Sequence, residues 1–574
     1  MITIPKDNHE DNNIARTLRK TILVTGLAAT LIVVGCSSPQ PDAGQTEDTN
    51  RPSEPIVLPQ PPRPELATRS DRAMQQAAIG EVAPTGYVLS QPGHPAGHLQ
   101  AQDRERYQHF DGNPIRRAAE DPVSTFSIDV DTASYANIRR LLQQGRLPPG
   151  DAVRVEELIN YFGYDYPVPE PGKAPFSVTI EQATTPWNAD TRLVQIGIRG
   201  YEPPQEEIPP ANLVFLIDVS GSMNGPDRLP LVINGLKLLT RQLGADDRIA
   251  IVVYAARTGV VLESTPGDQT ATIMAALDRL QAGGSTNGGD GIRAAYTQAR
   301  QGFIEGGINR VIIATDGDFN VGMIDQEALL DLVRQQRKSG ISLTTLGFGG
   351  GNYNDYLMDQ LAAAGDGNSA YIDTLSEARK VLVEERHSTL MTIASDVKIQ
   401  VEFNPAVVAE YRLIGYENRQ LEREDFNNDA VDAGDVGAGH TVTALYEVAL
   451  VGSGGERIDP LRYAGQDPAN AAPRGDELAF VRLRYKTPGE ASSQLLESPI
   501  PSTDTAAVAS DDLAFAAAVA AFGQHLRGGE HLEQFTPAEI HALASRGRGD
   551  DPDGYRGEFL QLIRLAESLS LAQP

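Results

Sequence analysis

A regular alternation of short apolar runs and amphipathic stretches across residues 211–390 constrains the fold more than any other feature of this chain. Leu213–Ile217 (LVFLI) and Val311–Thr315 (VIIAT) are continuous apolar runs, the pattern of parallel strands that are buried on both faces. The short run Val260–Glu263 is expected to be an antiparallel edge strand, and Leu375–His387 a closing helix. The alternation predicts an α/β fold: a doubly wound, mostly parallel, Rossmann-like sheet with helices on both faces.

The sequence on either side of this module follows other patterns. Residues 105–210 combine two amphipathic helical stretches with strand-like alternating segments, which predicts an α+β N-terminal region. Residues 391–574 contain further alternating segments and then amphipathic stretches such as Asp511–Arg527, which predicts a β-rich C-terminal region with terminal helices. Residues 487–507, rich in Pro, Ser and Thr, are expected to form a loop.

The two flanks are expected to form one domain. The ends of a compact module generally lie close together. Strand-like segments occur both before the proline-rich boundary at 203–210 and after Ser395. The module is therefore predicted to be inserted into a single β-rich domain to which both flanks contribute strands.

Oxygen-bearing side chains follow two of the predicted strands. Asp218, Ser220 and Ser222 form a D-x-S-x-S string directly after the run LVFLI, and Asp316 follows the run VIIAT. Thr286 lies in a glycine-rich loop, GGSTNGG, before a predicted helix. In a doubly wound sheet, the loops at the carboxyl ends of neighbouring strands face a shared crevice at the switch point. We therefore expect all five side chains to lie on one face.

This donor set favours a hard cation. Two carboxylates and three hydroxyls, without His or Cys, select Mg²⁺ first, with Ca²⁺ or Mn²⁺ as alternatives. Ser220, Ser222 and Thr286 are expected to be direct ligands, whereas Asp218 and Asp316 bind directly or hold coordinated waters. One coordination position is expected to stay open for a carboxylate from outside the chain. The D-x-S-x-S string alone is a weak signal, and its place after a buried strand gives it weight.

The pattern resembles the von Willebrand factor type A family and its metal-ion-dependent adhesion site, with all five motif positions filled. The resemblance implies a binding function, because such sites typically bind an Asp or Glu of a partner protein through the cation. A degenerate site that survives only as a structural relic is the alternative.

Residues 105–574 as a whole resemble bacterial lipoproteins that carry this module. DPVSTFSIDVDTASYANIRRLL, which begins at Asp121, resembles their N-terminal von Willebrand-associated domain. ELAFVRLRYKTPG and DDLAFAAAVAAFGQHLRGG resemble their C-terminal domain, whose function is not established. The resemblance implies an N-terminal domain over 105–210, a type A domain over 211–390 and a C-terminal domain over 391–574.

The only cysteine of the chain, Cys36, follows an N-terminal apolar run. Basic residues precede the run Thr21–Val34, which has the length of a signal-peptide core and is short for a spanning helix. The segment VVGCS resembles the bacterial lipobox, which implies a lipoprotein signal peptide over residues 1–35 and a lipidated Cys36. Ser37 then favours the outer membrane if the source is Gram-negative. An uncleaved anchor is the alternative, and residues 36–104 are predicted to be a disordered, proline-rich tether.

Charge and residue pattern exclude several function classes. Lys plus Arg is 49 and Asp plus Glu is 77, and the formal charge of -28 argues against a nucleic-acid partner. The His residues show no HExxH or triad context, and GFGGG at 347–351 lacks the Lys of a phosphate loop, so no enzyme is predicted. The expected function is that of a membrane-anchored envelope lipoprotein that binds a partner protein through the metal site. The alternative is a structural or assembly scaffold with a vestigial or purely stabilising metal site.

Two further acidic segments are interpreted as ordinary surface and cap features. In Asp129–Thr132 (DVDT), Asp131 or Thr132 is expected to cap the following helix. Asp425–Asp429 lacks the turn Gly and the closing Glu of an EF-hand, so an acidic surface loop is expected there.

Overall fold

The computed structural model describes residues 104–170, 172–284, 288–317, 326–459, 461, 476–490, 492–503, 505–506 and 508–572. All of these belong to one compact unit of the chain, His94–Pro574. The predicted signal peptide, Cys36 and the predicted tether up to residue 103 lie outside the described residues, and so does Thr286 of the predicted metal site.

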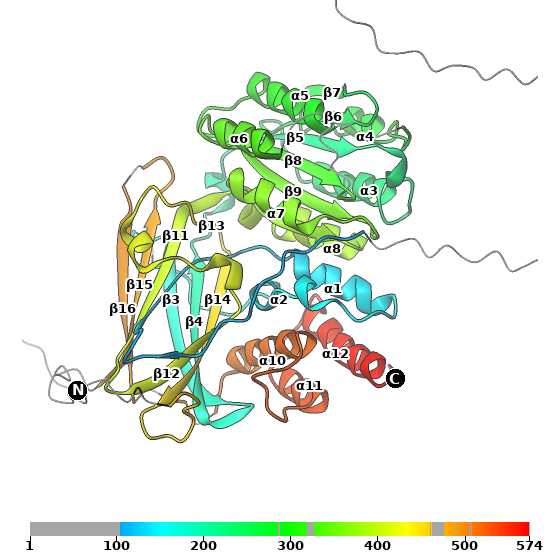
Figure 1. The fold of residues 1–574 in the computed structure, drawn as a ribbon. Coiled ribbons are helices and arrows are strands. Elements are labelled where there is room, and N and C mark those ends of the chain that lie inside the picture. The colour runs from blue at the N-terminus through cyan, green and yellow to red at the C-terminus, as the bar shows by residue number, and fades with distance from the viewer. Residues whose placement is uncertain are drawn as a thin grey trace, which may run out of the picture. The chain divides into compact units, whose positions relative to one another are not determined.

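Residues 211–390 form an α/β module (Figure 1). Its six-stranded sheet has the order β10-β9-β8-β5-β6-β7, and every pairing is parallel except that of β6 with β7. The antiparallel edge strand predicted around residues 260–263 is therefore confirmed as β7. The strands are β5 (Ala211–Asp218), β6 (Arg248–Tyr254), β7 (Gly259–Pro266), β8 (Ile308–Thr315), β9 (Ser342–Phe348) and β10 (Ser369–Ile372).

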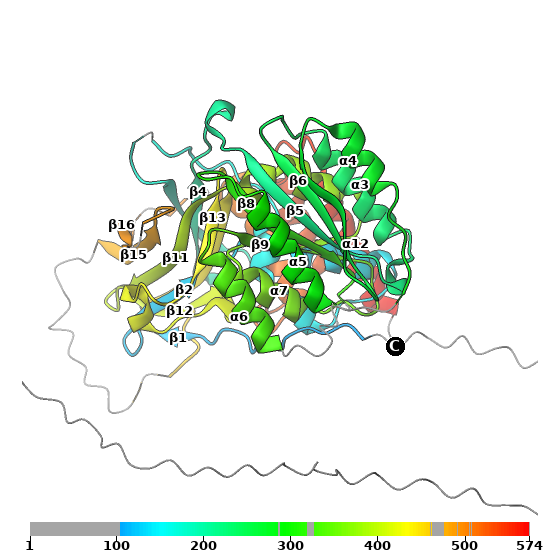
Figure 2. The ribbon, with the colours of Figure 1, turned by 90° about the horizontal axis from the view of Figure 1, so that it is seen from above.

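Helices cover both faces of this sheet (Figure 2). The apolar side chains of α3 and α4 pack with strand residues such as Phe215, and those of α5, α6 and α7 pack with residues such as Val214 on the opposite face. Successive strand residues point to opposite faces, so a strand covered on both sides must be apolar throughout. The predicted fold class is confirmed. These helices are α3 (Leu229–Thr240), α4 (Thr270–Leu277), α5 (Gly288–Gln301), α6 (Gln326–Arg337) and α7 (Asp355–Ala364).

The two flanks pair with each other in two antiparallel sheets. One sheet has the order β1-β12-β14-β4-β3, in which Tyr446 of β14, after the module, lies opposite Val194 of β4, before it. The other has the order β13-β11-β15-β16, with β2 paired to β11. The structure agrees with insertion of the module into one β-rich domain. The strands are β1 (Arg116–Arg117), β2 (Val123–Ser127), β3 (Phe176–Thr185), β4 (Asn188–Gly200), β11 (Thr392–Phe403), β12 (Val408–Ile414), β13 (Gly434–Gly437), β14 (Thr441–Leu450), β15 (Glu477–Lys486) and β16 (Gln494–Pro501).

The flanks also form a helical layer around α10 (Asp511–Leu526). Every residue of α10 from Leu513 to Gln524 is buried, as expected of a helix that is apolar on all sides. Gly523 permits the close approach of a neighbouring helix, since a Cβ there would lie 3.1 Å from Val155. None of the helices in the described ranges has the length and apolarity needed to cross a membrane. The other helices of the layer are α1 (Ala133–Gln143), α2 (Val155–Asn160), α11 (Pro537–Arg546) and α12 (Tyr555–Ala572).

Three elements differ from the prediction. β16 lies within residues 487–507, where a loop was expected, because the edge of β15 supplies hydrogen-bond partners that the local composition does not reveal. The helix α11 was not predicted, although it begins at a Thr-Glu capping box. The predicted closing helix is interrupted, and it consists of α8 (Leu375–Arg379), the π-helical segment Lys380–Glu384 and α9 (Arg386–Leu390).

Buried polar contacts join the module to its flanks. Arg419 donates hydrogen bonds to Asp129, at 2.9 Å, and to Asp131, at 3.0 Å. Asp131 also accepts a hydrogen bond from the backbone N–H of Ser369 in β10, at 2.7 Å. Thr132 occupies the N-cap position of α1 as predicted, but its side chain makes no capping hydrogen bond, and Asp131 is engaged in the contacts above.

Candidate metal centre

The residues of the predicted metal site follow β5 and β8. β5 ends at Asp218, and β8 ends at Thr315, one residue before Asp316. The two strands are parallel neighbours, with Ile217 opposite Ala314. The predicted adjacency of the runs LVFLI and VIIAT is confirmed, and it brings the two aspartates to the same edge of the sheet.

A short turn brings the serines of the string together beside the end of β5. The backbone N–H of Ser220 donates to Asp218 Oδ1 at 2.8 Å. The hydroxyl oxygens of Ser220 and Ser222 lie 2.9 Å apart. Asp218, Ser220 and Ser222 are therefore gathered in one place, as the spacing of the string predicts.

The glycine-rich loop lies against this turn. Its Gly284 carbonyl accepts a hydrogen bond from the Gly221 N–H at 2.9 Å, and its Gly283 N–H donates to the Val219 carbonyl at 2.7 Å. Gly284 has a φ of 91°, which favours glycine. Thr286 follows in the same loop but lies outside the described residues, so its place among the ligands stays a prediction.

The acidic side chains of the site are buried. Asp218 and Asp316 are 0% exposed, and the Thr315 hydroxyl donates to Asp218 Oδ2 at 3.1 Å. Burial raises the pKa of Asp218 to about 6, against the hydrogen bonds from Ser220, which lower it, and the charge of Asp316 acts in the same direction as burial. Two buried carboxylates at one strand edge are stabilised by a nearby cation.

The donor set fits a hard cation. Among the described residues, no group of three or more His, Cys, Asp and Glu side chains could hold a metal ion. A cation at this site would therefore depend on the hydroxyls of Ser220 and Ser222 as well as on the aspartates. Both oxygens of Asp218 already accept hydrogen bonds from the protein, which fits the role of orienting coordinated water better than that of direct ligation.

Arg228, which was not predicted from the sequence, also belongs to the site. Its Nη1 lies 3.2 Å from Asp316 Oδ2 and donates to the Ser222 carbonyl. Its Nη2 donates to the Gly350 carbonyl at 2.6 Å. The available signal was a single basic residue between the acidic string and α3.

The loop between β9 and α7, which contains Gly350, is also held by the first described residues. The backbone N–H of Arg104 donates to the Gly351 carbonyl at 2.8 Å, and that of Arg106 donates to the Tyr353 carbonyl at 2.9 Å. The Glu105 carboxylate accepts the Gly351 N–H at 2.7 Å. The segment 104–106 therefore runs alongside the loop that contacts the guanidinium.

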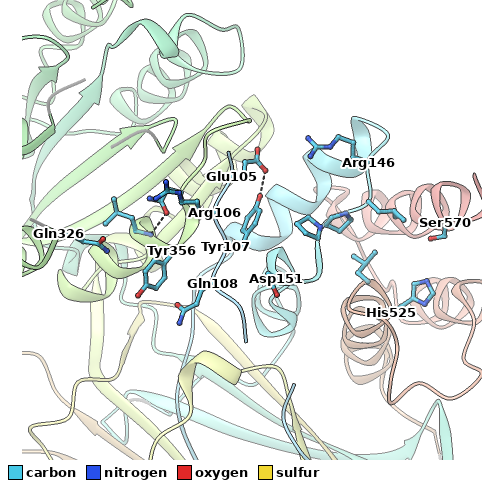
Figure 3. A pocket seen from close by; sticks show the side chains of 16 residues that line it. Glu105, Arg106, Tyr107, Gln108, Arg146, Asp151, Gln326, Tyr356, His525 and Ser570 are labelled. Carbon is cyan, nitrogen blue, oxygen red and sulfur yellow. Dashed lines mark hydrogen bonds between the residues drawn. The ribbon is translucent and has the colours of Figure 1, made fainter. Parts of the chain in front are cut away.

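A cavity of about 1220 Å³ is lined by a different set of residues (Figure 3). Its lining includes Glu105 and Tyr107, joined by a 2.7 Å hydrogen bond, together with Pro148 and His525. None of the metal ligands that the structure describes, Asp218, Ser220, Ser222 and Asp316, lines it. This cavity and the described oxygen donors are thus different places, and the donor chemistry identifies the candidate site.

Three family models match the chain. The model described as von Willebrand factor type A domain matches residues 212–385, that described as von Willebrand factor matches 101–195, and that described as uncharacterized protein YfbK, C-terminal, matches 388–569. The uncharacterized protein YfbK of Escherichia coli (strain K12) is 48% identical over 512 residues, which cover 88% of each chain. The chain belongs to the YfbK family of von Willebrand factor type A proteins. Proteins with the type A domain typically mediate protein interaction.

More distant relatives match smaller shares of this chain. The inter-alpha-trypsin inhibitor heavy chain H3 of Mesocricetus auratus is 26% identical over 276 residues, 44% of this chain and 30% of that protein. The solved structure of a von Willebrand factor type A protein from Catenulispora acidiphila is 15% identical, with a TM-score of 0.38, over 68% of this chain and 89% of that one. The predicted resemblance is confirmed at the level of the YfbK family.

Proposed function

We propose that this YfbK-family protein is an envelope-anchored binding protein that captures a partner protein through a divalent cation. The residues that hold the cation are Asp218, Ser220, Ser222, Thr286 and Asp316. The partner contributes an Asp or Glu carboxylate. The family supports a binding role, since proteins with the type A domain typically mediate protein interaction, and the proposal is one of binding rather than catalysis.

The proposal depends on one observation. The side chains of Asp218, Ser220 and Ser222 lie at the same sheet edge as the strand end that leads to Asp316. Oxygen donors from two separate stretches of the chain share one sheet edge because β5 and β8 are parallel neighbours. Burial of both aspartates is unfavourable for their charges and favours a cation there. Ser222 is only half-buried, so the donor cluster reaches the surface, where a partner can approach.

Mg²⁺ is the proposed cation, with Ca²⁺ or Mn²⁺ as alternatives, because every donor is a hard oxygen. Bound at the site, it supplies a Lewis-acidic contact for a carboxylate oxygen. The chain's own residues position the oxygen donors for the cation. Ser220 and Thr315 hold the Asp218 carboxylate with hydrogen bonds of 2.8 and 3.1 Å, and the turn keeps the two serine hydroxyls adjacent.

A membrane anchor is the second part of the proposal. Cys36 is lipidated after removal of residues 1–35, and the tether that ends before Arg104 holds the folded part at a membrane surface, the outer membrane in a Gram-negative cell. Cys36→Ser is expected to abolish labelling by a radioactive fatty acid and to leave residues 1–35 attached, which mass spectrometry of the chain would detect. Wild-type protein that is recovered from the membrane fraction without label and with residues 1–35 attached would contradict the lipid anchor.

The binding function is tested by capture of membrane-derived partners in Mg²⁺ and in EDTA. Wild-type protein is expected to retain a defined partner in Mg²⁺ and to release it in EDTA, and Asp218→Ala or Ser220→Ala is expected to abolish capture while the circular dichroism spectrum stays unchanged. Asp246→Ala, an exposed aspartate of the same module, is the matched control and is expected to bind normally. Partner capture that persists in EDTA would contradict the metal-dependent mechanism.

A structural or assembly scaffold is the second candidate. The observation that favours it is the Arg228 guanidinium beside Asp316, which already supplies one resident positive charge to the acidic site. On this alternative the metal site is vestigial or purely stabilising. Equal thermal stability in Mg²⁺ and in EDTA, together with metal-independent partner contacts, would favour the scaffold.

A further inference from the structure

We propose that Arg228 sets the net charge of the metal site, so that the loaded site attracts an anionic partner group at the expense of metal affinity. The inference rests on the proposed function and adds to it a residue that determines ligand preference. The observation behind it is the placement of a positive charge directly against one of the two acidic residues of the site.

The position of the guanidinium is fixed by three acceptors. Arg228 Nη1 lies 3.2 Å from Asp316 Oδ2 and also donates to the Ser222 carbonyl. Nη2 donates to the Gly350 carbonyl at 2.6 Å. Two of these acceptors belong to predicted ligand residues, so the charge is part of the site rather than a neighbour of it.

Partial burial strengthens the electrostatic effect of the Arg228 charge relative to that of an exposed arginine. The Arg228 side chain is 20% exposed and that of Asp316 is 0% exposed, whereas exposed ion pairs contribute little because water screens them. Gly349 makes the approach possible. Its φ is 65°, and a Cβ at this position would overlap the Arg228 side chain. The loop is therefore shaped to accept the guanidinium.

The charges of the site give a direct consequence. Asp218 and Asp316 carry two negative charges when ionised, which a divalent cation neutralises. Arg228 adds one positive charge, so the loaded site is cationic and attracts a carboxylate. The same charge repels the divalent cation and weakens its binding. Removing the charge of Arg228 must therefore change metal affinity and carboxylate affinity in opposite directions.

A purely mechanical role makes a different prediction. Arg228 could instead only hold the turn that contains Ser222 against the loop that contains Gly350. Its loss would then make the ligand side chains more mobile and weaken metal binding and carboxylate binding together. Arg228→Lys separates the two roles, because it keeps the charge and loses the planar guanidinium that serves three acceptors at once.

The experiment uses Mn²⁺ and acetate as probes on the full chain. Mn²⁺ affinity is measured by electron paramagnetic resonance of the free ion. Acetate binding to the loaded protein is followed through the loss of water proton relaxation as coordinated water leaves. Asp218→Ala gives the background from weak binding elsewhere on this acidic chain. Arg334→Gln, which removes an exposed arginine of the same module, is the charge control.

Arg228→Gln is expected to bind Mn²⁺ about tenfold more tightly and acetate about tenfold more weakly, the size expected for one unit charge at a partly buried site. Arg228→Lys, which keeps the charge, is expected to lie closer to the wild type than Arg228→Gln in both affinities, and Arg334→Gln is expected to match the wild type. Weaker or unchanged Mn²⁺ binding in Arg228→Gln, or identical behaviour of Arg228→Lys and Arg228→Gln, overturns the inference and leaves the proposed function standing. Equal Mn²⁺ binding by wild type and Asp218→Ala overturns the metal site itself, and the inference with it.

Discussion

Arg139 of α1 and Asp373, which follows β10, form a buried ion pair across the junction between the flanks and the module, with 2.8 Å between Arg139 Nε and Asp373 Oδ2. Their side chains are 2% and 4% exposed. Arg139 also pairs with Glu377 of α8 at 2.7 Å and with Glu558 of α12 at 2.9 Å. One guanidinium thus connects three parts of the fold.

Arg139→Met is expected to lower the free energy of unfolding by about 3–5 kcal/mol, because it leaves buried carboxylates without their counter-charge. Urea unfolding followed by circular dichroism measures the change. Arg334→Met is the control, since its pair with Asp331 is exposed and contributes at most about 1 kcal/mol. A loss at position 139 no larger than that at position 334 would contradict the structural role.

Acid is expected to destabilise the fold through His440. Burial, with a smaller contribution from Lys380, lowers the pKa of His440 from 6.5 to about 4. Between these values the unfolded chain binds a proton that the folded chain does not, so the free energy of unfolding falls as the pH drops from 6.5 towards 4. His440→Gln is expected to flatten this part of the stability curve. Parallel curves for the two proteins between pH 4 and 6.5 would rule out the contribution of His440.

Mg²⁺ is expected to raise the melting temperature of the wild-type protein above its value in EDTA. A ligand that binds only the folded state stabilises it by about 2.7 kcal/mol at a concentration of 100 times Kd. Asp218→Asn is expected to lose this gain and Asp246→Asn to keep it, as measured by scanning calorimetry. An equal rise in Asp218→Asn would place the stabilising ion elsewhere.

Residues 105–210 are expected not to fold on their own. In β4, Val194 and Ile196 are buried and pair with Tyr446 and Ala444 of β14, which follows the module in the chain. Without β14, these residues and the edge of β4 would be exposed to water. Poor dispersion of amide signals in the proton NMR spectrum is the expected result, and a well-dispersed spectrum would refute the shared domain.

The convergence of Asp218, Ser220 and Ser222 near Asp316 could be predicted because it follows from local rules. Continuous apolar runs indicated parallel strands buried on both faces, and adjacency at the switch point put their carboxyl ends together. The hydrogen bonds of the turn join residues two apart in the chain. Such relationships are contained in the spacing of the sequence.

The contacts of Arg228 and Arg419 could not be predicted in this way. Arg228 and Gly350 are 122 positions apart, and Arg419 and Asp129 are 290 apart. A capping role for Asp131 was reasonable locally, but a distant guanidinium and a strand N–H compete for the same carboxylate. The contacts of these residues depend on how separate parts of the chain pack together, and no local sequence pattern indicates them.

The hydrogen bonds of Arg104 and Arg106 to Gly351 and Tyr353 have a mechanical consequence. In the proposed arrangement, the chain before Arg104 leads to the membrane, and the partner is held beside the guanidinium that contacts the neighbouring Gly350. Tension between membrane and partner would then reach this loop and also α1, because the Glu105 carboxylate pairs with Arg140 at 2.8 Å. The loop beside the proposed partner site would therefore be among the parts of the fold that bear this load.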